Sequence, residues 1–271
     1  MHHTRVITSI VGLALLIALI GLGNLLIFWL VVSSAIVIGL LEFYNIVEAR
    51  QFPVYRLPGI LLGWLLSLVP LVSSSFGYLT LTDFTVTLII LALFLYALLT
   101  KRSLSESIPA LAMTFFGIAY VSWLLSHLIF LRGLPNGQHL VFYLLLLVWS
   151  GDTGAYYIGS LFGKHKLAPL VSPKKTLEGA AGGLVASLLA SCVAKWTFLP
   201  LLGYGDCFVL GILLATIAQL GDLCESMLKR GANVKDSGTI LPGHGGILDR
   251  LDGVMFAAPV LYYYSRIFLV V

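Results

Sequence analysis

Charged residues are scarce in this chain. Asp, Glu, Lys and Arg make up 10% of its 271 residues, whereas soluble domains carry about 25%. Apolar and aromatic residues make up 59%, which leaves too little polar surface for a water-soluble globule and too much apolar content for a disordered chain. Cysteine is scarce too, and the three scattered residues exclude a disulfide framework or a cysteine-based zinc motif. The composition therefore predicts a polytopic membrane protein.

Long apolar runs divide the chain into segments that could cross a bilayer. A helix needs about 20 such residues to cross about 30 Å of hydrocarbon. The expected spans are residues 6–22, 25–47, 59–72, 84–99, 108–130, 140–162, 177–199, 208–228 and 251–270. We therefore expect an all-α integral membrane protein with about nine transmembrane helices, forming one membrane domain over residues 1–271, with the first helix retained rather than cleaved.

Basic residues fall mainly on one of the two sides that nine spans would create. The N-terminus and alternate loops hold 13 of the 16 Lys and Arg residues, and only Arg132, Lys195 and Arg266 fall elsewhere. Because basic loops stay in the cytoplasm, we expect a cytoplasmic N-terminus and an external C-terminus. The net charge of +4 then reflects topology, and no nucleic-acid partner is expected.

Acidic residues concentrate in the second half of the chain, where eight of the twelve follow residue 150. This asymmetry predicts that helices one to five, within residues 1–131, act as a scaffold. Helices six to nine, within residues 140–271, are expected to carry the functional site together with cytoplasmic loops 163–176 and 229–249.

Two pairs of acids at i,i+3 spacing flank a polar segment. Asp222 and Glu225 lie in the eighth apolar run, and Asp249 and Asp252 lie at the start of the ninth, so each pair shares a helix face. An acid at bilayer depth costs about 2.5–3.5 kcal/mol on insertion scales and usually has a function or a partner. An ion pair of Glu225 with Lys229 and a favourable helix dipole at the ninth helix remain structural alternatives. The arrangement favours a divalent-cation site, because Mg²⁺ binds one or two carboxylates together with substrate phosphates.

The segment between these pairs is rich in glycine and in hydrogen-bond donors. Lys229, Arg230, Lys235, His244 and Arg250 can donate to phosphate oxygens. The glycines at 243, 245 and 246 permit close approach of the backbone to a ligand. The positive-inside bias alone would also explain Lys229 and Arg230, and that alternative stays open.

A second basic cluster precedes the seventh span. Ser172 is the expected N-cap and Pro173 the expected first helical residue, which would place Lys174 and Lys175 in the first turn. The helix dipole disfavours cations there, but a positively charged helix N-terminus suits an anion. We interpret the cluster as a phosphate site, with positive-inside bias as the alternative. Asp152, inside the sixth span, is a further candidate by the cost argument applied to Asp222.

One continuous run carries a resemblance. It reads Ser226-x-Leu-Lys-Arg, four residues, Lys235-Asp236-x-Gly238, then Leu241-Pro-x-His244-Gly-Gly-Ile-x-Asp249-Arg250-Leu-Asp252. This run resembles the signature of the phosphatidate cytidylyltransferases, also called CDP-diacylglycerol synthases, without a departure. The segment Ser-Pro-Lys-Lys-Thr-Leu-Glu-Gly at 172–179 is similar to a second block of that family. The first five helices resemble the family only in length and hydropathy.

The resemblance implies the reaction CTP + phosphatidate → CDP-diacylglycerol + pyrophosphate. It further implies dependence on Mg²⁺, with a second, monovalent ion as an open question, a homodimer, and a bacterial inner membrane or its equivalent, with the active site on the cytoplasmic side. Carried onto this chain, it implies that Asp222 and Asp249 are metal ligands. The expected catalytic residues are Asp222, Asp249, Lys229, Lys235, Asp236, His244 and Arg250. The expected substrate-binding residues are Lys174, Lys175, Arg230, Asp152, Glu225, Ser226, Gly245, Gly246 and Asp252.

Three other functions remain as alternatives. A CTP-dependent polyprenol kinase or an archaeal-type lipid cytidylyltransferase would also need carboxylates, metal and basic residues, but the unbroken signature argues against both. An ion-coupled transporter could use intramembrane acids and glycine-broken helices. A transporter would favour charges near the midplane and repeated halves, whereas this chain has no visible repeat and its charges cluster on one expected side.

Overall fold

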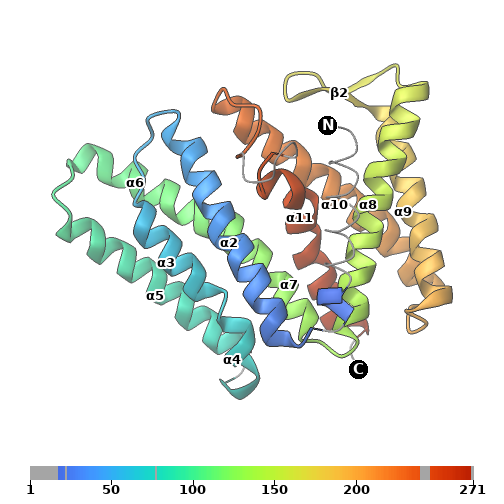
Figure 1. Cartoon of the computed structure of the whole chain (residues 1–271), viewed down its shortest axis with the longest axis horizontal. Coiled ribbons are helices and arrows are strands. Elements are labelled where there is room, and N and C mark those ends of the chain that lie inside the picture. The colour runs from blue at the N-terminus through green and yellow to red at the C-terminus, as the bar shows by residue number, and fades with distance from the viewer. Residues whose placement is uncertain (1–17, 22, 77, 239–244, 270–271) are drawn as a thin grey trace. The chain divides into compact units, whose positions relative to one another are not determined.

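A computed structural model describes residues 18–21, 23–76, 78–238 and 245–269, and it is mostly helical (Figure 1). The chain divides into two compact units. Unit 1 comprises Met1–Gly133 and Asp236–Leu248, and unit 2 comprises Leu134–Lys235 and Asp249–Val271.

Unit 1 is built around α2. Its elements are α2 (Leu25–Glu48), α3 (Arg56–Leu66), α4 (Val69–Phe76), α5 (Tyr78–Leu99), α6 (Leu104–Gly117), the π-helical η1 (Ile118–Trp123) and α7 (Leu124–Arg132). Asn24 caps the N-terminus of α2, and its side chain accepts a hydrogen bond from the backbone N–H of Ile27 at 2.9 Å. Side chains far apart in sequence join the helices: the Tyr44 hydroxyl donates to the carbonyl of Thr114 at 3.1 Å, and the Trp29 indole donates to that of Ser67 at 2.9 Å.

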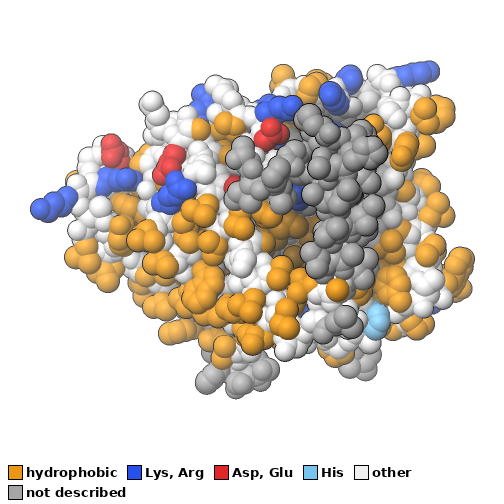
Figure 2. Space-filling view, viewed as in Figure 1, with side chains coloured by type: hydrophobic (Ala, Val, Ile, Leu, Met, Phe, Trp, Pro, Cys, Tyr) orange, Lys and Arg blue, Asp and Glu red, His pale blue; other side chains and the backbone are white. Residues whose placement is uncertain are grey.

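The outer surface of unit 1 is apolar. Leu91, Phe94, Leu95 and Leu98 on α5 are each more than half exposed, and Figure 2 shows hydrophobic side chains spread over this part of the surface. A water-soluble protein rarely exposes so large a contiguous apolar patch. This surface is the one expected of helices that face lipid.

Six described helices are long and apolar enough to cross a membrane: 25–48, 81–99, 104–132, 137–162, 177–197 and 204–231. The prediction of a helical, polytopic membrane protein is thereby confirmed. The expected span 6–22 lies largely outside the described residues. The expected span 59–72 lies within the apolar stretch Arg56–Val72, which is shorter than the six helices above. The last expected span corresponds to α11 (Leu248–Tyr264), which has 17 residues. The count of nine and the cytoplasmic N-terminus stay predictions.

Unit 2 is a helical bundle with one small hairpin. Its elements are α8 (Gly137–Phe162), β1 (Lys166–Ala168), β2 (Ser172–Thr176), α9 (Leu177–Thr197), α10 (Tyr204–Gly231), α11 from Asp249 onward and the π-helical η2 (Ser265–Leu269). Helices α8 and α9 lie side by side along their length in Figure 1. The Ser187 hydroxyl donates to the carbonyl of Leu147 at 2.8 Å, which ties α9 to α8.

Glycines allow this close approach of α8 and α9. A Cβ added at Gly154 of α8 would lie 2.5 Å from the Cβ of Ala186 and 2.8 Å from the carbonyl oxygen of Gly182, both on α9. These neighbours are backbone or a single methyl group, so neither can move aside without moving its helix. Small residues at such contacts are the usual means by which membrane helices pack closely.

The Gly154→Ala variant is therefore expected to destabilise unit 2. Overpacking of this kind costs about 1–3 kcal/mol, so the midpoint of thermal denaturation in detergent should fall by several degrees. The matched control is Gly205→Ala near the start of α10, where an added Cβ would meet no atom within 4 Å. Equal midpoints for the two variants would contradict this packing.

The expected start of α9 is wrong. Ser172 and Pro173 lie in strand β2, which pairs antiparallel with β1 through Lys166–Thr176 and Ala168–Ser172. Helix α9 begins at Leu177, and the Thr176 hydroxyl accepts a hydrogen bond from the N–H of Gly179 at 3.1 Å. Proline is tolerated in a two-stranded hairpin because both strands are edges, and the β-branched Thr176 suits extended backbone and also caps the helix.

Candidate active site

A cleft in unit 2 gathers charged residues from three elements. Asp152 of α8, Lys174 and Lys175 of β2, and Asp222 of α10 line a cavity of about 480 Å³. This volume lies within the range of small-molecule sites. Lys175 forms an ion pair with Asp222, and both side chains keep part of their surface in contact with solvent. A phosphate group entering the cleft could therefore take the place of the carboxylate beside Lys175.

The hairpin that carries the two lysines is held by one acid. The carboxylate of Glu178, in the first turn of α9, accepts the backbone N–H groups of Lys164 at 3.1 Å and His165 at 3.2 Å. The same carboxylate lies 2.6 Å from Nδ1 of His165. Both chain ends of the hairpin are thus fixed at the N-terminus of α9. The lysines therefore lie just before that helix rather than in its first turn, and both line the cleft.

Asp222 uses both carboxylate oxygens. Ser226, one turn further along α10, donates to Oδ1 at 3.3 Å, and Lys175 pairs with Oδ2. Asp152 and Asp252 lie close enough to Asp222 for the charges of these carboxylates to interact. Carboxylates from α8, α10 and α11 are therefore within electrostatic reach of one another, and a bound cation would relieve their repulsion.

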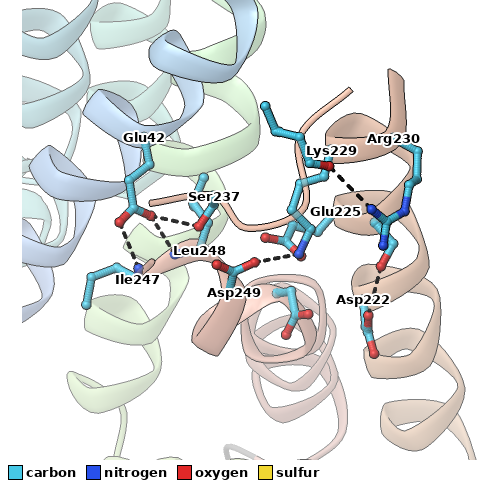
Figure 3. A network of polar contacts seen from close by, with 12 residues as sticks. Glu42, Asp222, Glu225, Lys229, Arg230, Ser237, Ile247, Leu248 and Asp249 are labelled. Atoms are coloured by element: carbon cyan, nitrogen blue, oxygen red, sulfur yellow. Dashed lines mark hydrogen bonds and ion pairs between the residues drawn. The ribbon is translucent and has the colours of Figure 1, made fainter. Parts of the chain in front are cut away.

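A second charged cluster joins α10 to α11. The Lys229 ammonium lies 2.5 Å from Oε2 of Glu225 and 2.5 Å from Oδ1 of Asp249 (Figure 3). All three side chains are largely buried: 11% of the Lys229 side chain, 2% of Glu225 and 10% of Asp249 are exposed to solvent. The structural alternative for Glu225, an i,i+4 ion pair, is thus present. Lys229 holds Asp249 against α10, which positions one of the two expected metal ligands.

The remaining expected site residues are less closely grouped. The Arg230 guanidinium donates to the carbonyl of Val234 at 3.4 Å, whereas Lys235, Asp236 and Arg250 are exposed. Gly245 has a φ of 80°, which only glycine adopts readily, and Gly246 is buried. His244 lies outside the described residues.

The donors present fit a hard divalent cation. Among the residues that the structure describes, no three His, Cys, Asp or Glu side chains meet as a preformed metal cluster. Mg²⁺ does not need one, because it keeps several waters and binds one or two carboxylates together with substrate phosphates. Asp152, Asp222 and Asp252 bring carboxyl groups from three helices within electrostatic reach of one another, and carboxylate oxygens are ligands that Mg²⁺ prefers.

Sequence reasoning missed one buried acid. Glu42 of α2 was assigned to the scaffold, yet its carboxylate binds the polar segment that carries the signature glycines. The signal that could have revealed it is the one used for Asp222: an acid inside an apolar run.

The fold and the cleft together define a class: a polytopic helical membrane protein in which lysines and carboxylates gather in one cleft. Comparison with known proteins makes the assignment specific. A family model described as the cytidylyltransferase family matches residues 3–268, and the chain belongs to that family.

Curated relatives extend over nearly the whole chain. The phosphatidate cytidylyltransferase of Bacillus subtilis is 32% identical over 269 residues, covering 97% of each chain. The phosphatidate cytidylyltransferase of Staphylococcus haemolyticus is 35% identical, covering 95% of this chain and 96% of its own. The enzyme of the same name from Staphylococcus aureus is 44% identical over 168 residues, covering 61% of this chain and 62% of its own.

Proposed function

We propose that the protein is a phosphatidate cytidylyltransferase, which converts CTP and phosphatidate into CDP-diacylglycerol and pyrophosphate. The observation that carries this proposal is the solvent-accessible cleft where Lys174, Lys175, Asp152 and Asp222 meet. It offers cations for a triphosphate and carboxylates for a metal ion within a bundle of apolar helices. The lipid's acyl chains can stay in the bilayer while CTP enters from water.

The chemistry is an in-line displacement at the α-phosphorus of CTP. A phosphate oxygen of phosphatidate forms the new bond to that phosphorus while the bond to the pyrophosphate oxygen breaks, and the bonding electrons leave with pyrophosphate. The attacking oxygen is already anionic near neutral pH, so no strong base is needed. Lys174 and Lys175 would hold the triphosphate and offset the charge that develops on it.

Asp222 and Asp249 would hold the metal ion. Bound Mg²⁺ supplies charge neutralisation between the two phosphorylated substrates. Asp222 would exchange its contact with Lys175 for the ion, which releases Lys175 to the triphosphate. Lys229 and Ser226 would orient the two carboxylates. Asp152 and Asp252 lie within electrostatic reach of Asp222, and their oxygens could also hold a second, monovalent ion.

The same proposal places the protein in a bacterial inner membrane as a homodimer. The distribution of basic residues supports a cytoplasmic N-terminus and a cleft that opens to the cytoplasm, where CTP is available. The resemblance to the family is the support for the dimer.

The deciding assay follows the α- and γ-phosphates of CTP separately. Purified protein in detergent micelles receives phosphatidate, Mg²⁺ and CTP labelled at the α-phosphate or, in parallel, at the γ-phosphate. We expect α-label in a solvent-extractable lipid, γ-label in pyrophosphate, and one pyrophosphate per turnover. α-Label left in soluble CDP with γ-label in lipid would establish a kinase instead. No turnover with any lipid phosphate would favour a transporter.

A further inference from the structure

Glu42 is a buried acid whose two carboxylate oxygens accept hydrogen bonds from three groups of the described residues. It lies in the last third of α2, and 2% of its surface is exposed. Its Oε1 accepts the backbone N–H of Ile247 at 2.9 Å, and its Oε2 accepts the N–H of Leu248 at 3.0 Å and the hydroxyl of Ser237 at 3.1 Å (Figure 3). All of these groups belong to unit 1.

These bonds explain how a carboxylate is tolerated there. Burial of an acid in an apolar span is costly unless its oxygens are satisfied. Within the described residues, no Lys or Arg forms an ion pair with Glu42. Hydrogen bonds to a charged acceptor are stronger than neutral ones. Ser237, Ile247 and Leu248 therefore satisfy the buried carboxylate, and the carboxylate in turn holds these residues.

The contact with Glu42 leaves no room for a side chain at two glycines of the polar segment. A Cβ at Gly238 would lie 2.6 Å from Oε1 of Glu42, and one at Gly246 would lie 2.5 Å from Oε2. The added atom at Gly246 would also collide with the Ser237 hydroxyl. Any side chain at either position would therefore push the segment off the carboxylate. Gly238 and Gly246 therefore allow the backbone to approach the Glu42 carboxylate closely.

The bonds to Ile247 and Leu248 also determine where α11 begins. The first N–H groups of a helix have no partner within the helix, and negative charge is favourable at that end. Leu248 is the first residue of α11, so Glu42 acts as its N-terminal cap from a distant part of the sequence. The next residue along the chain is Asp249, one of the two proposed metal ligands.

We propose that Glu42 is a positioning residue for cytidylyl transfer. It fixes both ends of the segment from Ser237 to Leu248 and so sets the first turn of the helix that carries Asp249 and Asp252. This role rests on the proposed function. Glu42 touches no reacting atom in this account, and it acts through the backbone that presents the carboxylates.

The test compares Glu42→Gln with wild type in the labelled-CTP assay. The amide keeps the size of the side chain but directs an N–H₂ group at N–H donors, so at least one of the backbone bonds is lost. Loss of groups that orient metal ligands typically costs about 10- to 100-fold in metal affinity or activity. We expect kcat per folded molecule to fall by about that factor, with a rise in the Mg²⁺ concentration that gives half-maximal rate.

Two further variants provide a control and an intermediate case for Glu42→Gln. Glu48→Gln alters the exposed acid at the end of the same helix, which pairs with Arg56 at 3.1 Å, and it should leave kcat and Mg²⁺ dependence unchanged. Ser237→Ala removes one of the three bonds to Glu42 and keeps both backbone bonds, so its loss of kcat should be smaller than that of Glu42→Gln.

The outcomes separate this role from the function on which it rests. An active wild type with a Glu42→Gln variant of unchanged kcat and Mg²⁺ dependence would overturn the positioning role. A loss of rate that only follows the folded fraction would assign Glu42 to stability and overturn it as well. If Glu42→Gln does not accumulate as folded protein, Glu42→Asp, which keeps the charge, takes its place, and failure of both variants to fold would also reject the role. A wild type that labels no lipid would refute the proposed function and this role with it.

Discussion

Replacement of Asp222 by Asn is expected to lower turnover about 100- to 1,000-fold, the loss typical when one preorganised electrostatic contact to a transition state is removed. The amide is a poor ligand for Mg²⁺ and cannot form the ion pair with Lys175. Initial rates measured over a range of Mg²⁺ concentrations would reveal the loss. Extra Mg²⁺ should restore only part of the activity, because the missing charge also organises the cleft.

The matched control is Asp83→Asn, an exposed acid on α5 outside the cleft. It should keep wild-type turnover. Both variants should insert into membranes and elute from size-exclusion chromatography as wild type does, because Asp222 is partly exposed and its loss leaves no buried charge. Full Mg²⁺-dependent turnover of the Asp222→Asn protein would refute its assignment as a metal ligand.

Replacement of Lys229 by Met is expected to cost about 3–5 kcal/mol of folding stability, because it leaves buried charges without a partner. Lys229 is the cation between Glu225 and Asp249, and all three side chains are largely buried. Methionine has a similar shape but no charge, so the two carboxylates would repel each other. Thermal denaturation in detergent, together with the yield of folded protein, measures the effect.

A double variant identifies the origin of this loss. Glu225→Gln combined with Lys229→Met removes one of the two unpaired buried charges, so part of the stability should return, whereas Asp249 remains unanchored and activity should stay low. The control is Lys101→Met, an exposed lysine before α6, which should denature as wild type does. A Lys229→Met protein as stable as wild type would show that the two ion pairs contribute nothing to the fold.

The helical membrane architecture could be predicted because it depends on local composition. Runs of about 20 apolar residues are visible in the sequence, and six of them form helices of membrane-spanning length in the structure. The pairing of Glu225 with Lys229 could also be anticipated, since i,i+4 spacing on one helix fixes it. Both inferences use only neighbours within a turn or two of helix.

The contacts that shape the site could not be predicted in this way. The partner of Asp222 is Lys175, which lies on a different element and was expected in a helix rather than in a strand. The start of α9 depends on the hairpin bonds to Glu178 and on the Thr176 cap, which compete with the apparent Ser-Pro helix start. Glu42 and Ile247 lie 205 positions apart, so no local pattern links them.

The most direct test asks whether CTP occupies the cleft of unit 2. Ser160 lines that cleft and is exposed, so a Ser160→Cys variant, made after Cys192, Cys207 and Cys224 are changed to Ser, offers a single thiol to an alkylating reagent. At a CTP–Mg²⁺ concentration about ten times its dissociation constant, we expect alkylation to slow about tenfold by mass action. The control is Ser105→Cys, at an exposed position of α6, which should be alkylated at the same rate with and without CTP. Equal alkylation of the Ser160→Cys protein with and without CTP–Mg²⁺, in a preparation that still makes CDP-diacylglycerol, would place the nucleotide elsewhere and contradict this account.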